Sequence, residues 1–320
     1  MWKYITKEQT KEFLLSLNLI DNNLTNKEKI EKLYSISNNI ENNYKIFKIR
    51  KRNGKFRTIY EPNYILKNIQ RNILNNILNN KSISKYAKAY KKGIFLKDNA
   101  IDHLNKNIIL KLDIKNFFES INFIDIYNNC FQIEYFPKEI GMLLTHLCTY
   151  NNYLPQGSPT SSYISNLVMK EFDETIGEFC DKNNISYTRY SDDLTFSGNF
   201  NPSIIINKIR KHLLKLGFEI NNEKIHIIKK GNRQTVTGIV VNKKLQVSCN
   251  FRKEIRKQIY YIKKYGIKSH LEFTNNNIFE IKYLNSLYGK INYVLQINKS
   301  DKEFIEYKMY INKILKQKKL

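Results

Sequence analysis

Two adjacent acidic residues between short strand-like runs form the part of the sequence best suited to chemistry. Asp192 and Asp193 separate residues 186–190 from residues 194–197, and both runs read as half-buried strands. Neighbouring carboxylates repel one another, so their ionised forms need a cation or a hydrogen-bond donor nearby. An Asp-Asp pair can also simply stabilise a turn. Alone, the pair is only a hint of a metal site.

A third carboxylate strengthens the metal interpretation. Asp113 follows an apolar strand-like run at residues 107–112, and functional side chains often gather where such strands end. If this strand pairs with the hairpin that carries Asp192 and Asp193, the three carboxylates converge. They would then supply hard oxygen ligands for two magnesium ions about 3.5–4 Å apart, an arrangement suited to in-line phosphoryl transfer.

Hydrophobic periodicity indicates the elements that must position these acids. Two alternating runs around Asn53-Gly54 give a strong hairpin signal within residues 44–60. The turn at residues 154–159 is expected to open one long helix with an apolar face from Ile164 to Phe179. Other expected elements are a strand pair around Asn242 and helices at residues 6–18, 25–36, 64–79, after Phe118, at 204–216 and from about 251 onward. The predicted fold class is therefore α+β.

The charge distribution favours a polyanionic partner. The chain of 320 residues has a formal net charge of +25, of which residues 42–98 contribute +13 and residues 246–320 contribute +10. Residues 99–245 between them carry only +2. Charge that serves solubility alone usually mixes both signs, whereas two one-signed blocks rich in Tyr and Phe indicate nucleic acid. A membrane surface is the weaker alternative, because no lipidation signal accompanies the charge.

The sequence also indicates a cytoplasmic protein. It contains no apolar run of membrane-spanning length, and its N-terminus lacks the apolar core of a signal peptide. The four cysteines are widely separated and are expected to be buried free thiols, so zinc is not expected: Cys130, Cys148, Cys180 and Cys249.

Four motifs, found in order, resemble those of the reverse transcriptases. They are Lys55-Phe-Arg57 before Tyr60-Glu-Pro62, Asp113-Ile-Lys-Asn-Phe-Phe-Glu-Ser-Ile121, Leu154-Pro-Gln-Gly-Ser-Pro159 and Tyr190-Ser-Asp-Asp193. Any one of them is weak, but four in the family's order are specific. The resemblance implies a right-hand polymerase with an antiparallel-sheet palm. Residues 1–98 would form N-terminal helices and fingers, 99–245 the palm with some fingers elements, and 246–320 a basic helical thumb.

The same resemblance implies a role for each motif residue. Asp113, Asp192 and Asp193 would be catalytic and would bind two Mg²⁺ ions, or Mn²⁺ as a substitute, with the Ile114 carbonyl as a further ligand. Tyr190 would lie near the primer end. The nucleotide-binding residues for an incoming dNTP would be Lys55, Arg57, Phe118, Gln156 and Lys224. Phe118 matches the position of a sugar gate, although a core position is the alternative. Lys224 would lie near the leaving phosphates, or else would be an ordinary solvated lysine.

Two further strings resemble signatures of the bacterial retron reverse transcriptases. Asn99-Ala-Ile-Asp-His103 matches the first and Val236-Thr237-Gly238 the second; alternatively, Asn99 is a helix cap and His103 a surface histidine. Retron type implies a cognate structured noncoding RNA that is primed from a guanosine 2′-hydroxyl and copied into multicopy single-stranded DNA. It further implies antiphage defence with an effector protein, and a separate host ribonuclease H. The family more often has Ala where this chain has Ser191.

The basic C-terminal helix is the predicted RNA-binding region. Its candidate residues are Lys253, Arg256, Lys257, Tyr260, Lys263 and Lys264. A solvated helix face is the alternative. Two competing functions stay open at this point. One is a diversity-generating or abortive-infection reverse transcriptase, and the other is a non-catalytic RNA-binding scaffold on a decayed polymerase fold.

Overall fold

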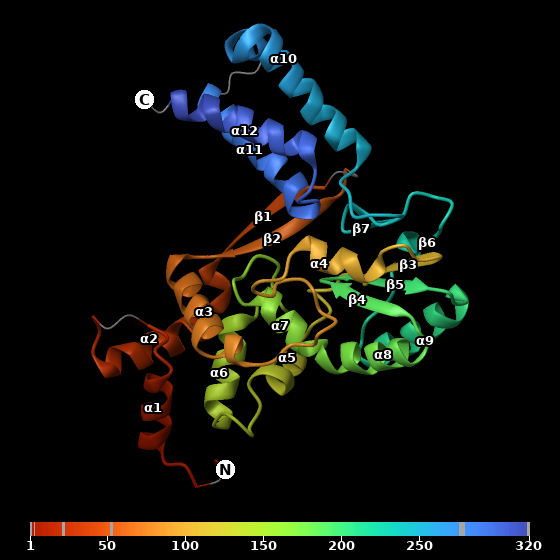
Figure 1. The fold of residues 1–320 in the computed structure, drawn as a ribbon. Coiled ribbons are helices and arrows are strands. Elements are labelled where there is room, and N and C mark those ends of the chain that lie inside the picture. The colour runs from red at the N-terminus through yellow and green to blue at the C-terminus, as the bar shows by residue number, and fades with distance from the viewer. Residues whose placement is uncertain (1, 3, 21–22, 52–53, 275–278, 319–320) are drawn as a thin grey trace. The chain divides into compact units, whose positions relative to one another are not determined.

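The computed structural model describes residues 2, 4–20, 23–51, 54–274 and 279–318. Within this range the chain divides into two compact units (Figure 1). The first unit comprises Met1–Ile94, Leu110–Phe196 and Phe200–His226, and the second comprises Phe95–Ile109, Ser197–Asn199 and Ile227–Leu320. The predicted division into fingers, palm and thumb stays a prediction.

The first unit begins with two capped helices and a hairpin. Helices α1 (Lys7–Ser16) and α2 (Asn26–Asn38) each start with a capping box, followed by the short helix η1 (Ile40–Asn43). In the box of α2, the Thr25 backbone N–H donates to Glu28 Oε2 at 2.7 Å, which satisfies a donor that the helix leaves unpaired. Strands β1 (Tyr44–Arg50) and β2 (Phe56–Pro62) then pair antiparallel, so the predicted hairpin is confirmed. Asn53 of its predicted turn lies outside the described residues.

A four-stranded sheet carries the predicted acids. Its strands are β3 (Ile108–Asp113), β4 (Ser186–Tyr190), β5 (Asp193–Gly198) and β6 (His226–Lys229), in the order β4-β5-β3-β6. Strand β3 is therefore a neighbour of β5, as the convergence of the three carboxylates requires. The residues of β3 are mostly buried, which explains their continuous apolar run.

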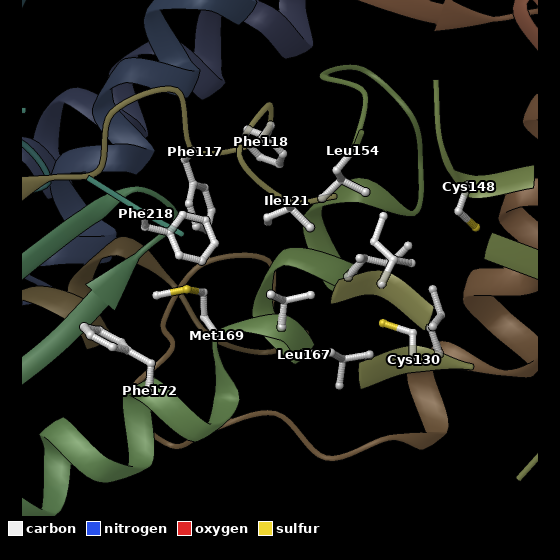
Figure 2. Close-up of a cluster of buried hydrophobic side chains, with 14 of the residues drawn as sticks. Phe117, Phe118, Ile121, Cys130, Cys148, Leu154, Leu167, Met169, Phe172 and Phe218 are labelled. Atoms are coloured by element: carbon white, nitrogen blue, oxygen red, sulfur yellow. The ribbon is translucent and has the colours of Figure 1, made fainter. Parts of the chain in front are cut away.

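The helices of the first unit pack around a continuous hydrophobic core. They are α3 (Tyr64–Asn76), η2 (Leu78–Asn80), α5 (Phe123–Cys130), α6 (Lys138–Cys148), α7 (Ser161–Val168), α8 (Lys170–Lys182), α9 (Pro202–Lys215) and η4 (Asn222–Lys224). Part of the core is shown in Figure 2, where the Cys130 and Cys148 sulfurs lie among the apolar side chains. Met169 is fully buried in the same core.

One helix prediction for this unit was wrong in detail. The long helix expected after residues 154–159 is two helices, because the backbone of Met169 leaves helical geometry while its side chain continues the apolar face. The helix expected after Phe118 is confirmed as α5, which begins at Phe123. The intervening residues form turns that include Asn116 with a left-handed φ of 49°.

The second unit is mostly helical. It contains α4 (Leu96–Ala100), η3 (Ile101–His103), β7 (Thr235–Val236), β8 (Ile239–Val240), α10 (Cys249–Phe273), α11 (Glu280–Ile297) and α12 (Lys302–Gln317). The strand pair expected around Asn242 is confirmed in part. Val240 and Gln246 form an antiparallel bridge on either side of Asn242, whereas β7 and β8 turn earlier, at Thr237-Gly238, where both residues have positive φ. Cys249 was expected to be buried and is exposed, because it occupies the first turn of α10; the other three cysteines are buried.

Helices and sheets are mixed in this chain, so the predicted α+β class is confirmed. Among the described residues, no helix is both long enough and apolar enough to span a bilayer.

Candidate active site

Three carboxylates meet where β3 ends beside the β4–β5 turn. Asp113 is the last residue of β3 and is nearly buried. Asp192 lies in the turn, and Asp193 is the first residue of β5. The turn is joined to the β3 end by a hydrogen bond, in which the Ile114 N–H donates to the Asp192 carbonyl at 3.0 Å. All four residues proposed as metal ligands are thus brought together.

These carboxylates perturb one another. The surrounding atoms desolvate Asp193, and the charges of Asp192 and Asp113 act in the same direction, so that the pKa of Asp193 rises to about 6. Desolvation also raises the pKa of Asp192, and the Asp113 charge adds to that effect. The Lys224 ammonium, 2.7 Å from Asp113 Oδ2, opposes both shifts. The protein therefore neutralises the negative charge of this site only in part.

The donor set fits divalent magnesium in its chemistry. Carboxylate oxygens are the hard ligands that this ion requires, and the raised pKa values mark a site short of positive charge. In the described part of the chain, no three Asp, Glu, His or Cys side chains already stand in a metal-binding arrangement, and Asp113 is engaged by Lys224.

Sequence reasoning missed Lys111 at this site. It lies two residues before Asp113 on β3, so both side chains face the same side of the sheet. Desolvation lowers the pKa of Lys111, and the Asp193 charge opposes that shift, so the ammonium stands near the acids. The alternation of the strand was the signal that could have identified it.

The turn at residues 154–159 lies directly against the β1–β2 hairpin. The Tyr60 N–H donates to the Gln156 carbonyl at 2.9 Å. Gly157 has a φ of +127°, and a Cβ at this position would lie 2.7 Å from the Tyr60 carbonyl oxygen. Only glycine therefore permits this approach, which puts Gln156 beside the strand that carries Arg57.

The two predicted phosphate-binding cations stand on the surface of that hairpin. Arg57 lies opposite Ile49 in the β1–β2 register and is exposed. The Lys55 side chain is also exposed, and its carbonyl accepts a hydrogen bond from the Lys51 N–H at 2.7 Å.

Phe117 and Phe118 follow Asp113 in a run of turns, and both are buried. Their ring centroids are 5.4 Å apart in an edge-on arrangement. Phe117 also packs against Phe218 at 5.9 Å (Figure 2). Both rings are therefore supported by the core, and the gate role of Phe118 stays a prediction.

Tyr190 is the last residue of β4, directly before the β4–β5 turn, and is half-buried. Desolvation raises its pKa, and Tyr90 contributes to the shift. The Tyr90 hydroxyl donates to Ser191 Oγ at 3.2 Å. Tyr90 is a second residue that sequence reasoning missed, because its segment is remote from the turn along the chain.

The chain matches the family model for reverse transcriptase (RNA-dependent DNA polymerase) over residues 49–264. The retron Ec83 reverse transcriptase of Escherichia coli is 34% identical over 68% of this chain and 75% of its own length. The retron Ec86 reverse transcriptase of the same organism is 31% identical over 65% of this chain. The chain belongs to the retron reverse transcriptases.

The region of this reverse transcriptase that matches the Ec86 enzyme spans 66% of that enzyme's length, which is just under two thirds. Among solved structures, apo telomerase from Candida tropicalis, truncated from its C-terminal domain, is similar with a TM-score of 0.46 and 17% identity. That match covers 65% of this chain and 55% of the telomerase chain.

The two retron signatures of this reverse transcriptase meet in the second unit. The Asn99 side-chain amide donates a hydrogen bond to Thr237 Oγ1 at 3.4 Å. His103 is fully buried, with Nδ1 2.7 Å from Ser197 Oγ. The alternatives of a helix cap and a surface histidine are therefore wrong, because Asn99 lies within α4, whose N-cap position is Phe95, and both side chains are buried. Val236 is buried beside them, and Gly238 completes the β7–β8 turn with a φ of 83°.

The predicted RNA-binding residues all lie on α10, but they differ in availability. Exposed side chains on this helix are Lys253, Lys257, Tyr260, Lys263 and Lys264. The Lys264 ammonium lies 5.7 Å from the Tyr260 ring centroid and 5.0 Å from that of Tyr265. Arg256, by contrast, donates from Nη2 to Glu303 Oε2 at 2.8 Å, so its charge is already paired within the unit.

Proposed function

We propose that this reverse transcriptase copies a structured noncoding RNA into multicopy single-stranded DNA, starting from the 2′-hydroxyl of a guanosine in that RNA. The observation that carries the proposal is the convergence of Asp113 with Asp192 and Asp193. Membership of the retron family supports the choice of substrate over that of other bacterial reverse transcriptases.

In the proposed reaction, Asp113, Asp192, Asp193 and the Ile114 carbonyl hold two Mg²⁺ ions. The chemistry supplied by such a pair is activation of the attacking hydroxyl and neutralisation of the leaving pyrophosphate. The protein's own contribution is to hold the acids close together and to place Lys224 and Lys111 near them, where these cations oppose the rise of the acids' pKa values. Lys224 now pairs with Asp113, and when the metal sites fill we expect it to turn toward the leaving phosphates.

The substrate side of the site follows from the hairpin and the turn beside it. Arg57 suits a bidentate phosphate contact and Lys55 a point-charge contact with the dNTP triphosphate. Gln156 lines the nucleotide pocket, Phe118 excludes a ribose 2′-hydroxyl, and Tyr190 packs near the primer end. Each role is supported by the motif match together with the exposure or location described above.

At larger scale we propose fingers, palm and thumb at residues 1–98, 99–245 and 246–320. The basic α10 would bind the cognate RNA and its RNA–DNA product. An effector protein would act with the enzyme in antiphage defence, and a host ribonuclease H would remove the template. All of these would take place in the cytoplasm.

The experiment that tests the activity is DNA synthesis by the purified protein on a primed RNA template with Mg²⁺. We expect the wild type to extend the primer and Asp192→Asn/Asp193→Asn to be inactive while still binding RNA. Synthesis by this variant would contradict the metal assignment. RNA binding without synthesis by either protein would favour the scaffold function.

A further inference from the structure

One residue of the β4–β5 turn has a backbone conformation that is unfavourable unless neighbouring groups stabilise it. Ser191, directly before Asp192, has a φ of 61°. L-residues other than glycine rarely adopt this left-handed region, and when they do the surrounding structure usually enforces it. Because Ser191 sets the direction of the chain, its conformation determines where Asp192 and Asp193 project.

A buried guanidinium holds this residue by its backbone. Arg189 is fully buried, and its Nη1 donates to the Ser191 carbonyl at 3.1 Å. Its Nε and Nη2 donate to the Asp173 carboxylate at 2.9 and 2.6 Å, and Nη2 also reaches Asn166 Oδ1 at 3.1 Å. Arg189 thereby connects the turn to two helices, α7 through Asn166 and α8 through Asp173.

The acceptors of Arg189 are themselves fixed. Asp173 is fully buried and also accepts from the Tyr187 hydroxyl at 2.8 Å. The Asn166 amide donates to the Ala89 carbonyl at 2.9 Å, which ties in the segment that carries Tyr90. The Tyr90 hydroxyl then contacts Ser191 Oγ from outside the core. A buried hydrogen-bonded network of this kind favours one geometry.

Stability alone is a poor explanation for this arrangement. A buried ion pair contributes little compared with apolar residues of similar volume, because both charges must be desolvated. A lysine could keep the charge pair with Asp173, but it lacks the planar fork that reaches two acceptors at once. The contact that a stability role leaves unexplained is the one from Arg189 Nη1 to the Ser191 carbonyl.

We propose that Arg189 is a positioning residue, which holds the Ser191 carbonyl and so keeps the turn in the left-handed form that presents Asp192 and Asp193 beside Asp113. Asp173 and Asn166 orient the guanidinium. This inference rests on the proposed polymerase function, because it assigns a role to the geometry of that same site.

The test compares Arg189→Lys and the neutral pair Arg189→Gln/Asp173→Asn with the wild type on a primed RNA template. We expect kcat to fall by about 10- to 100-fold, as for a modest misplacement of reacting groups, with the affinity for RNA unchanged. Adding Ser191→Gly to either variant should recover most of kcat, because glycine adopts positive φ without support.

A second measurement does not depend on activity. Hydrogen–deuterium exchange at the Ile114 amide, which donates to the Asp192 carbonyl, reports the turn in metal-free protein. We expect faster exchange in both Arg189 variants and recovery with Ser191→Gly. Ile176→Ala is the matched control, because it opens a cavity in the same helix α8 and removes no hydrogen-bonding group of the network. It should lower the melting temperature and leave kcat and this amide unchanged below melting.

Three results would overturn the proposal. An unchanged kcat in both folded Arg189 variants would remove the role, as would a loss that Ser191→Gly fails to restore. A matching loss in Ile176→Ala would reduce Arg189 to general packing. If the neutral pair does not fold, Arg189→Lys alone decides. A wild type that makes no DNA would instead remove the proposed function, while the exchange measurement would still test the hold of Arg189 on the turn.

Discussion

At the scale of single residues, the site brings like-charged carboxylates together, which is electrostatically unfavourable. Three acids are crowded together, and desolvation, together with the charges of Asp192 and Asp113, raises the pKa of Asp193 to about 6. Two cations that compensate them, Lys111 and Lys224, come from different elements. Crowded like charges of this kind often mark functional sites.

Replacement of Phe118 by Ala should raise the ratio of ribonucleotide to deoxynucleotide incorporation, because the ring that excludes the 2′-hydroxyl is lost. We expect a change of about tenfold or more, which corresponds to about 1.4 kcal/mol of steric discrimination. Competition between rNTP and dNTP on one template measures it. Phe117→Leu is the control, since that ring is buried against Phe218, and it should change stability without changing sugar selectivity. Unaltered selectivity in Phe118→Ala would exclude this ring as the gate.

At the scale of elements, close approaches and ion pairs decide how the site and the helical unit are held. The turn that carries Gln156 approaches β2 only because position 157 is glycine. In the second unit, Glu303 on α12 accepts from Arg256 and Arg252 on α10, which joins these two helices.

Gly157→Ala should raise the KM for dNTP, because its Cβ would push the turn away from the strand that carries Arg57. It should also destabilise the protein by about 1–3 kcal/mol, through positive φ and overpacking. Gly217→Ala is the matched control, since Gly217 has a φ of +77° but nothing within 4 Å of an added Cβ. Steady-state kinetics and thermal melting distinguish the two. Equal KM values in both variants would contradict the positioning argument.

Glu303 should make the stability of the helical unit depend on acid pH. Hydrogen bonds from Arg256 lower the pKa of Glu303 from 4.5 to about 2. A carboxylate with a depressed folded pKa contributes stability above its unfolded pKa, and this contribution is lost as the pH falls from about 5 toward 2. Melting temperatures between pH 7 and 3 should therefore converge for the wild type and Glu303→Gln.

Glu306→Gln provides the comparison for that experiment, because Glu306 is exposed on the same helix. It should follow the wild type at every pH. A gap between the wild type and Glu303→Gln that stays constant down to pH 3 would show that Glu303 does not act through its charge.

The strands and the acidic residues of the site could be predicted from the sequence, but the contacts between distant segments could not. The hairpin follows from local alternation, and the strand ending at Asp113 follows from its continuous apolar run. The break at Met169 was not predictable in this way, since its side chain continues the apolar pattern. The sequence did not single out Arg189, because its partner Asp173 lies on a separate helix and only tertiary packing brings the two together.

At the scale of the whole molecule, a net charge of +25 favours binding to nucleic acid over a wide surface. Some of these cations are nevertheless already paired with acidic side chains of the same chain, and their charge is therefore partly neutralised. Lys290, for example, pairs with Glu254 at 2.9 Å, whereas Lys253 and Lys257 have no ion pair among the described residues.

Lys253→Met/Lys257→Met should therefore weaken RNA binding and reduce the slope of log K against log salt by about 1 to 2, one for each lost phosphate contact. Lys290→Met, which removes a lysine that is already paired, should change the slope little. Filter binding across a salt series measures both. Equal slopes in the two variants would contradict an RNA-binding role for this face of α10.

The most direct test of the central claim is extraction of nucleic acid from cells that express the gene with its native flanking DNA, compared with Asp192→Asn/Asp193→Asn. We predict a short single-stranded DNA in the wild type alone, whose mobility shifts after cleavage of a 2′–5′ linkage by a debranching enzyme. Linear DNA without a branch would contradict the retron reaction and favour another bacterial reverse transcriptase. DNA of the same kind and amount in the variant would contradict the assignment of Asp192 and Asp193 as metal ligands.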